Sequence, residues 1–211
     1  MYQPDSFRED RTEVLHDLIR AHPFATLVTH EGGALAADHL PLLFEPRPGG
    51  HGTLLGHLAA ANPLCRTGAT ETAALVVFQG PQAYISPSWY PSKAEHGKVV
   101  PTWNYAVVHA EGRLRFHRDP EWLHAQVSAL TARHEAGREA PWAVTDAPAD
   151  FVERQLRGIV GIEIAIDSIA GKWKVSQNRP PADRKGVIAG LERTASPGSQ
   201  AMASLVEERD R

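Results

Sequence analysis

Residues 86–105 bring together an unusual number of side chains that are able to bind a ligand. The stretch reads SPSWYPSKAEHGKVVPTWNY and holds two tryptophans, two tyrosines, three serines and three prolines. Its aromatic residues follow neither the two-residue period of a strand nor the 3.6-residue period of a helix, so we expect a loop. Proline restricts that loop and lowers the entropy cost of presenting rings and donors in one arrangement. The stretch is a candidate binding site, although a loop that only caps one end of a barrel would have the same composition.

Residues 171–179, GKWKVSQNR, form a second candidate, this time for an anion. On a strand, Lys172 and Lys174 share one face while Trp173 points to the other, so we expect Trp173 in the core and both lysines along a solvent-facing groove. Four hydrogen-bond donors then follow in a row: Ser176, Gln177, Asn178 and Arg179. Cations and donors at one strand end suit a phosphate, but a basic strand edge that discourages aggregation is an equally good interpretation.

The motifs of the common enzyme and metal sites are missing from the sequence. Its eleven histidines include His39, His57 and His109 on expected strands, yet there is no HExxH or CxxC spacing and only one cysteine, Cys65, so we predict no metal site. The sequence also lacks GxSxG, GxGxxG and GxxxxGK[ST], which argues against a serine hydrolase, a Rossmann site and a P-loop. We assign no catalytic residue. Aromatic groups, amide donors and scattered basic residues remain, and together they suit a flavin.

Hydrophobic periodicity and turn residues divide the chain into short strands and a few helices. We expect helices at 10–21, 120–136 and about 148–158, and strands at 24–30, 34–44, 53–58, 73–80, 82–87, 102–110, 113–117, 159–169 and 171–176. Turns at Gly80-Pro81 and Glu111-Gly112 would make hairpins of several of them. Hairpin-linked strands favour a mostly β, antiparallel α+β barrel over a doubly wound parallel sheet. We expect one domain over residues 1–191 and a polar, loosely held tail over 192–211.

The composition is that of a globular protein and limits the partners to expect. The chain has 211 residues, of which 42% are hydrophobic and 22% charged, and its net charge is −3. That charge does not favour a nucleic-acid-binding surface, although the basic residues between Lys172 and Lys185 leave a local DNA contact open. The sequence has no leader-like start and no apolar run of about 20 residues. We therefore expect no membrane association and a cytoplasmic location, which the single cysteine also favours.

Several unusual strings, in order along the chain, are similar to those of one known family. They include PFATLVT, HLPLLF, GHLAAANP, FQGPQAYISPSWYPSK, GKVVPTWNY, VHAEGRLRF, GIVGIEI and GKWKVSQNR. Together they resemble the FMN-binding negative transcriptional regulators of the PaiB type, from residue 1 to about residue 191. One position departs from the family, which usually reads GHLARANP where this chain has Ala60. If that arginine contacts phosphate, FMN would bind more weakly here unless Arg66 or Lys93 replaces it.

The resemblance implies a split β-barrel like that of pyridoxamine-phosphate-oxidase-like flavoproteins, and a homodimer with FMN at the subunit interface. It also implies repression of sporulation and protease genes in bacilli. The negative net charge favours an indirect effect on these genes over direct DNA binding. The residues that we expect at the cofactor are His39, His57, Asn62, Ser86, Lys93, Trp103, Asn104, Lys174, Ser176, Gln177 and Arg179. Trp89 and Tyr90 could instead be anchors of the dimer interface.

Three functions remain open from the sequence. We favour an FMN-binding, regulatory dimer with no efficient reaction of its own. The second function is a flavin-dependent oxidoreductase that acts on an unknown small molecule. The third is a haem-binding or haem-degrading split barrel, in which His39 or His57 would be the iron ligand. The absorbance spectrum of the purified protein distinguishes flavin from haem.

Overall fold

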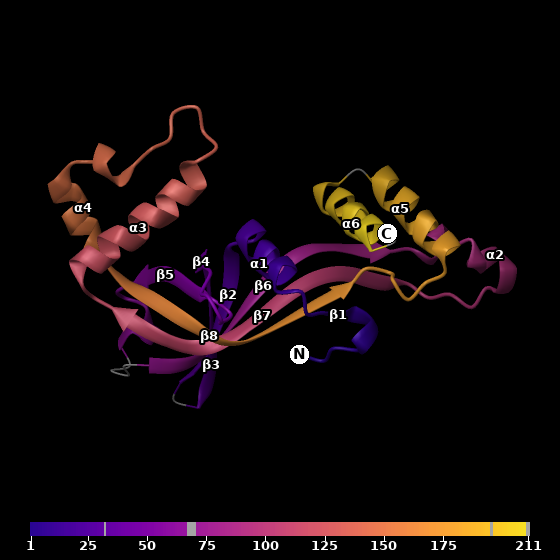
Figure 1. Ribbon diagram of the computed structural model, residues 1–211, viewed down its shortest axis with the longest axis horizontal. Helices are drawn as coiled ribbons and strands as arrows, with labels where there is room; N and C mark the ends of the chain where they lie inside the picture. Colours follow the sequence, from indigo (N-terminus) through magenta and orange to yellow (C-terminus); the bar gives the residue numbers. More distant parts are fainter. Residues whose placement is uncertain (32, 67–70, 195, 210–211) are drawn as a thin grey trace. The chain divides into compact units, whose positions relative to one another are not determined.

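The computed structural model describes residues 1–31, 33–66, 71–194 and 196–209 (Figure 1). Within these ranges the strands are β1 (Arg8–Glu9), β2 (Phe24–Glu31), β3 (Ala34–Pro41), β4 (Leu43–Glu45), β5 (Thr53–Ala59), β6 (Glu71–Ile85), β7 (Thr102–His117) and β8 (Ile159–Lys174). The α-helices are α1 (Thr12–Ala21), α2 (Ser92–His96), α3 (Pro120–Glu135), α4 (Ala149–Leu156), α5 (Pro181–Thr194) and α6 (Pro197–Glu208). No helix of this described part is long and apolar enough to cross a membrane.

The strands form one sheet in the order β3-β2-β6-β7-β8-β5-β4, and β1 pairs with β8. The pairs β1–β8, β2–β3, β2–β6, β4–β5 and β5–β8 are all antiparallel. Helices precede, interrupt and follow these strands in the chain. The predicted antiparallel α+β fold is therefore confirmed.

Three strands are longer than the sequence suggested. β6, β7 and β8 each run continuously through two segments that we expected to be separate strands, so the hairpins predicted at Gly80-Pro81 and Glu111-Gly112 are wrong. The glycines allow close packing instead of a turn. A Cβ at Gly80 would lie 3.1 Å from the carbonyl oxygen of Ala106, and a Cβ at Gly112 would overlap the carbonyl oxygen of Ala165.

The chain divides into two compact units, which we describe separately. Unit 1 comprises residues 1–18, 79–108 and 170–211, and unit 2 comprises residues 19–78 and 109–169. β6, β7 and β8 each contribute residues to both units, so the expected single domain over 1–191 stays a prediction. Because each unit is assembled from segments far apart in sequence, neither can be cut from the chain as one continuous piece.

The core of unit 2 is formed by strands in which buried and more exposed residues alternate. Every second residue of β5 is buried, beginning with Leu54, and Leu54 lies opposite the fully buried Ile164 of β8. The same register places His57 opposite Gly161. β3 differs, because most of its residues are exposed. The core face of this unit is thus well defined on β5, whereas most residues of β3 are not covered by other parts of unit 2.

Helix α3 begins with a capped turn in unit 2. Asp119 Oδ2 accepts a hydrogen bond from the backbone N–H of Trp122 at 3.1 Å, and Pro120 occupies the first helical position, as such helix starts favour. The ring of Trp122 stacks on His117 with centroids 4.1 Å apart. It also lies against Gly161, where a Cβ would overlap the indole. The missing side chain lets α3 approach β8 closely.

The aromatic loop of unit 1 is held by helix α5. The indole of Trp89 covers Gly190, where a Cβ would overlap its ring. Ser92 donates its hydroxyl proton to Asp183 Oδ2 at 2.7 Å, and its backbone N–H donates to Asp183 Oδ1 at 3.1 Å. Tyr90 is buried as well. The loop therefore has packing partners in its own chain, where Tyr90 is buried and Trp89 is half-buried.

The C-terminal segment differs from the loose tail that we expected over 192–211. Helix α6 packs against α5 (Figure 1), burying Met202, Ala203 and Val206. Ser196 caps the helix by accepting a hydrogen bond from the backbone N–H of Ser199 at 3.2 Å. The apolar face is narrow and partly built from alanine, so the surrounding Ser, Gly and Glu residues hid its periodicity in the sequence.

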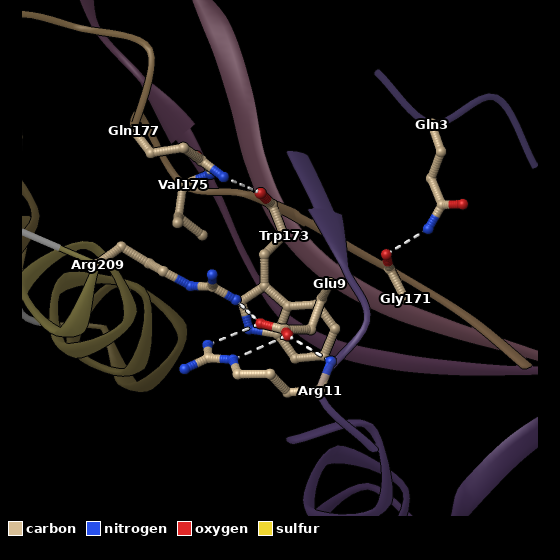
Figure 2. A network of polar contacts seen from close by, with 8 residues as sticks. All are labelled: Gln3, Glu9, Arg11, Gly171, Trp173, Val175, Gln177 and Arg209. Atoms are coloured by element: carbon tan, nitrogen blue, oxygen red, sulfur yellow. Dashed lines mark hydrogen bonds and ion pairs between the residues drawn. The ribbon is translucent and has the colours of Figure 1, made fainter. Parts of the chain in front are cut away.

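Glu9 connects the two ends of unit 1. Its carboxylate is 2% exposed and pairs with Arg11 Nη2 at 2.8 Å and with the guanidinium of Arg209. Figure 2 shows both guanidinium groups at this carboxylate. A buried carboxylate is stable only when it is paired and hydrogen-bonded. The cluster therefore ties the strand β1 to the residue that follows α6.

Candidate functional site

The residues expected at a cofactor fall in both units. Unit 1 holds Ser86, Lys93, Trp103, Asn104, Lys174, Ser176, Gln177 and Arg179, and unit 2 holds His39, His57 and Asn62. In unit 1, the first residues of β7 and the turn that follows β8 supply most of the group. These two segments contact each other through side chains, so they define the candidate site of this unit.

Lys174, the last residue of β8, is the cation at the centre of that site. Its Nζ donates to the carbonyl oxygen of Trp103 at 2.8 Å and to Thr102 Oγ1. An ammonium group has three protons, so it can bind one further acceptor. Burial lowers the pKa of Lys174, and the positive charges of Lys172 and Arg179 lower it further. An anion bound here would relieve this repulsion and favour the charged lysine.

Lys172 does not line a solvent-facing groove, so that expectation is wrong. Its side chain is 8% exposed, and its Nζ donates to the carbonyl oxygen of Tyr2 at 3.0 Å. The ammonium also lies 5.5 Å from the ring centroids of both Tyr2 and Tyr105. Aromatic faces stabilise a cation removed from water, and this explains how the lysine is buried. The prediction that Trp173 belongs to the core is confirmed, since it is 4% exposed.

Asn104 and Ser176 meet in the interior of unit 1. Asn104 Nδ2 donates to Ser176 Oγ at 2.9 Å, and both residues are buried. Ser176 has a φ of 66° and is the one non-glycine residue with positive φ in the described ranges. That conformation costs roughly 1–2 kcal/mol. The hydrogen bond helps to hold the turn after β8 in this shape, so the pair helps to position Lys174.

Gln177 and Arg179 follow in the same turn but have different roles. Gln177 Oε1 accepts from the backbone N–H of Val175 at 2.8 Å, and its Nε2 donates to the carbonyl oxygen of Trp173 (Figure 2). Its amide therefore closes the end of β8. The guanidinium of Arg179 lies 4.9 Å from the ring centroid of Tyr90. Burial raises the pKa of Tyr90 more than the charge of Arg179 lowers it, so the phenol stays neutral beside a cation.

The aromatic loop supplies the remaining unit 1 residues. Ser86 caps a short 3-10 turn by accepting from the backbone N–H of Ser88 at 3.2 Å, and Lys93 Nζ donates to Ser88 Oγ at 3.3 Å on the surface. Trp103 is 54% exposed and meets Tyr84 edge to face, with centroids 6.2 Å apart. Trp103 thus has a partly exposed side chain, and its backbone carbonyl oxygen binds Lys174.

The three candidate residues of unit 2 lie apart from one another in their contacts. His39 is exposed, with its Nδ1 3.1 Å from Thr26 Oγ1 and its ring stacked on Phe24. His57 Nδ1 lies 2.8 Å from Gln126 Oε1 of α3. Asn62 Nδ2 donates to Asp38 Oδ1 at 2.7 Å, and its Oδ1 accepts from a backbone N–H two residues on.

Asn62 thus uses its side-chain oxygen and one amide proton within unit 2, and each histidine keeps Nε2 for another partner. β3 and β5, which carry the histidines, contact each other but are not hydrogen-bonded neighbours in the sheet. Among the described residues, no three His, Cys, Asp or Glu side chains are grouped as metal ligands would be.

Sequence reasoning missed three residues that shape these sites. Thr102 and Tyr84 flank Trp103 and Lys174, and Gln126 orients His57. Gln126 is buried, and its Nε2 has no hydrogen-bond partner. A glutamine in the middle of a helix carries no motif, but a polar residue among apolar helix positions is the signal that could have drawn attention to it.

The antiparallel sheet, with helices between and after its strands, defines an α+β protein. Residues 1–168 match the family described as "Putative FMN-binding domain". The chain belongs to this family. The match ends before Lys174 and the turn that follows β8.

Proteins from a bacterium and a fungus match nearly the whole chain. "Protease synthase and sporulation protein PAI 2" of Bacillus subtilis is 35% identical over 209 residues, covering 99% of this chain and 98% of the relative. "Uncharacterized protein AN0679" of Emericella nidulans is 33% identical, with 99% of this chain and 97% of the relative covered. The resemblance to the PaiB type is thereby confirmed.

Solved structures support the fold at lower identity. A conserved hypothetical protein, Rv2991 from Mycobacterium tuberculosis, superposes with a TM-score of 0.59 at 13% identity, covering 85% of this chain and 94% of its own. The FAD and haem binding protein from Mycobacterium smegmatis gives a TM-score of 0.57 at 20% identity, with coverages of 79% and 73%. At this identity the likeness concerns the fold alone.

Proposed function

We propose that the protein binds FMN and that the cation cluster around Lys174 in unit 1 receives its phosphate. The observation that carries the proposal is the placement of Lys174, whose Nζ binds Thr102 Oγ1 and the carbonyl oxygen of Trp103 and whose pKa is lowered by burial and, further, by the positive charges of Lys172 and Arg179. A bound dianion would offset the repulsion among three cations at one strand end. A phosphate monoester is such a group, because it carries close to two negative charges at neutral pH. Membership of the family described as "Putative FMN-binding domain" supplies the cofactor class.

The residues of unit 1 fit such a cofactor. Lys174 has one proton left for an acceptor, and Arg179 lies near enough to act on its charge. The partly exposed side chain of Trp103 suits stacking against a flat ring. When bound, FMN would supply one- and two-electron redox chemistry. Ser86 and Lys93 remain proposed cofactor contacts from the loop, and the expected roles of His39, His57, Asn62, Asn104, Ser176 and Gln177 at the cofactor stay predictions.

The experiment compares FMN with riboflavin, which lacks the phosphate. Titration of the full chain by calorimetry should show tighter binding of FMN, and Lys174→Met or Arg179→Gln should lower FMN affinity by roughly tenfold or more while leaving riboflavin affinity nearly unchanged. Arg154→Gln is the matched control, because this arginine pairs with Asp150 on the surface of unit 2. Equal losses for both ligands would show that the cluster supports the fold and not the phosphate.

We also propose a homodimer with a regulatory role; the name of the Bacillus subtilis relative, "Protease synthase and sporulation protein PAI 2", connects that protein with protease synthesis and sporulation. Exposed apolar side chains in each unit support it, among them Phe24 and Leu35 in unit 2 and Trp103 and Val100 in unit 1. The net charge of −3 favours an indirect effect on transcription over direct DNA binding. A dimeric mass in light scattering at micromolar concentration is expected, and a monomeric mass would contradict the proposal.

Haem binding is a second candidate because of the way His57 is held. Its Nδ1 is anchored by Gln126 Oε1, which leaves Nε2 to coordinate iron, and such anchoring is common for metal-bound histidines. The absorbance spectrum of the reconstituted protein decides between the candidates, since a Soret band lost in His57→Ala would favour haem. Reduction of bound flavin by NADPH, followed by reoxidation with a small-molecule acceptor, would favour a flavin-dependent oxidoreductase.

A further inference from the structure

A cavity of about 470 Å³ lies within unit 2, where the start of α3 and the end of α4 meet the first residue of β8. Its floor is apolar and includes the buried Leu123 and Leu156 together with Ile159. Cavities of this size commonly hold small molecules. None of the eleven residues expected to bind the cofactor lines it, but Ala60 does, the position at which the resembled family usually has arginine.

Charged groups stand at the exposed edge of this cavity. Arg118, Arg157 and Glu153 all line it and are all exposed, giving one excess positive charge. Arg118 is held in place because its Nη2 donates to the carbonyl oxygen of Cys65 at 2.7 Å. A guanidinium presents several N–H donors in a fixed plane that matches a carboxylate. The cavity thus combines an apolar floor with two anion-binding groups.

Ala60 opens this space. The residue lines the cavity, and its backbone N–H donates to the carbonyl oxygen of Gly158 at 2.8 Å, which fixes its position beside α4. A methyl side chain leaves the volume empty, whereas a long side chain at this position would occupy part of it.

The geometry points to a binding site for a small organic anion with an apolar body, held by Arg118 and Arg157 over a floor that includes Leu123 and Leu156. The apolar part of the ligand replaces water against the leucines, and its carboxylate pairs with the guanidinium groups. This site does not depend on FMN being bound in unit 1.

The probe that tests the site is 2-naphthoate, with 2-naphthylmethanol as its neutral counterpart of similar shape. Calorimetry on the full chain should show binding of 2-naphthoate and at least roughly tenfold weaker binding of the alcohol. Arg157→Gln should weaken 2-naphthoate roughly tenfold or more and leave the alcohol unchanged. Arg154→Gln, on the same helix but outside the cavity, is the control and should leave both unchanged.

A second pair of variants tests the volume. Ala60→Phe should abolish binding of both probes by filling the cavity, while Ala61→Phe, its exposed neighbour, should not. Circular dichroism establishes that both variants are folded. Absence of 2-naphthoate binding, equal losses in Arg157→Gln and Arg154→Gln, or full binding in Ala60→Phe would each overturn the inference. Displacement of 2-naphthoate by FMN would also overturn it, because the cavity would then belong to the flavin site.

Discussion

The turn after β8 in unit 1 and the cavity beside α3 in unit 2 both gather cations, but they use their polar groups differently. In the turn, Asn104, Ser176 and Gln177 bond to one another or to the backbone. At the cavity, Arg118 and Arg157 are exposed above apolar side chains. The difference teaches that residue type alone does not identify a ligand contact. A side chain whose bonding groups are already used by the protein stabilises the fold, and one with remaining capacity is available to a ligand.

The largest effect that would test this distinction is expected at Glu9, whose carboxylate is fully engaged in unit 1. Glu9→Ala leaves Arg209 and Arg11 without their buried partner, so the free energy of unfolding should fall by about 3 kcal/mol or more. Chemical denaturation measures it. Asp5→Ala is the control, because the Asp5–Arg8 pair is exposed and should contribute less than about 1 kcal/mol. Similar losses in the two variants would refute the idea that Glu9 holds the unit together.

Asn104 should follow, since its amide is bonded within the protein. Asn104→Ala removes the partner of the buried Ser176 hydroxyl, and an unsatisfied buried group costs about 1–3 kcal/mol. Lys174→Met should change unfolding by less than about 1 kcal/mol, because burial already disfavours its charge. The comparison fails if Lys174→Met is the more destabilising of the two.

The preference for FMN over riboflavin should depend on pH through Lys174. Its pKa is lowered by burial and by Lys172 and Arg179, so as pH rises the lysine loses its charge at a lower pH than an ordinary lysine does. The phosphate stays dianionic throughout this range, since its second pKa is about 6. The affinity ratio should therefore fall by up to about tenfold on the alkaline side, measured by fluorescence titration. In Lys174→Met the ratio should be flat, and a ratio that rises with pH in the natural sequence would contradict the assignment.

The smallest effect isolates the backbone strain at Ser176. Ser176→Gly and Ser176→Ala both remove the hydroxyl that binds Asn104, but only glycine adopts a φ of 66° without strain. The glycine variant should therefore be more stable than the alanine variant by about 1 kcal/mol, measured by thermal unfolding. Equal stability would mean that the turn relaxes when the serine is replaced.

The sequence predicted much of the sheet but misread its glycines. Alternating apolar residues located the strands around Leu54 and Ile164, because a half-buried strand must repeat every two residues. Gly80 and Gly112 were interpreted as turns, whereas both lie within strands where a neighbouring chain comes close. A glycine permits both arrangements, and only contacts distant in sequence decide between them.

The candidate site could be predicted only in part. Strand alternation correctly put Trp173 in the core and placed Lys174 on the other face, but it also predicted an exposed Lys172, which is buried against Tyr2 and Tyr105. The partner that a polar residue finds, such as Ser176 for Asn104, lies 72 residues away in the chain. Local pattern carries no information on such pairs, so engaged and available donors look alike in the sequence.

The pairing of Glu9 with Arg209 also determines which of the two units can finish folding first during synthesis of the chain. The chain emerges from the ribosome in the direction from N-terminus to C-terminus, and segments fold as they emerge. Unit 2 ends at Ile169, forty residues before Arg209, so its strands are all synthesised while the partner of Glu9 is still to be translated. Until then the nascent chain carries a carboxylate that lacks one of its two arginines. Unit 1 is therefore completed after unit 2, although residues 1–18 of unit 1 are synthesised before any part of unit 2.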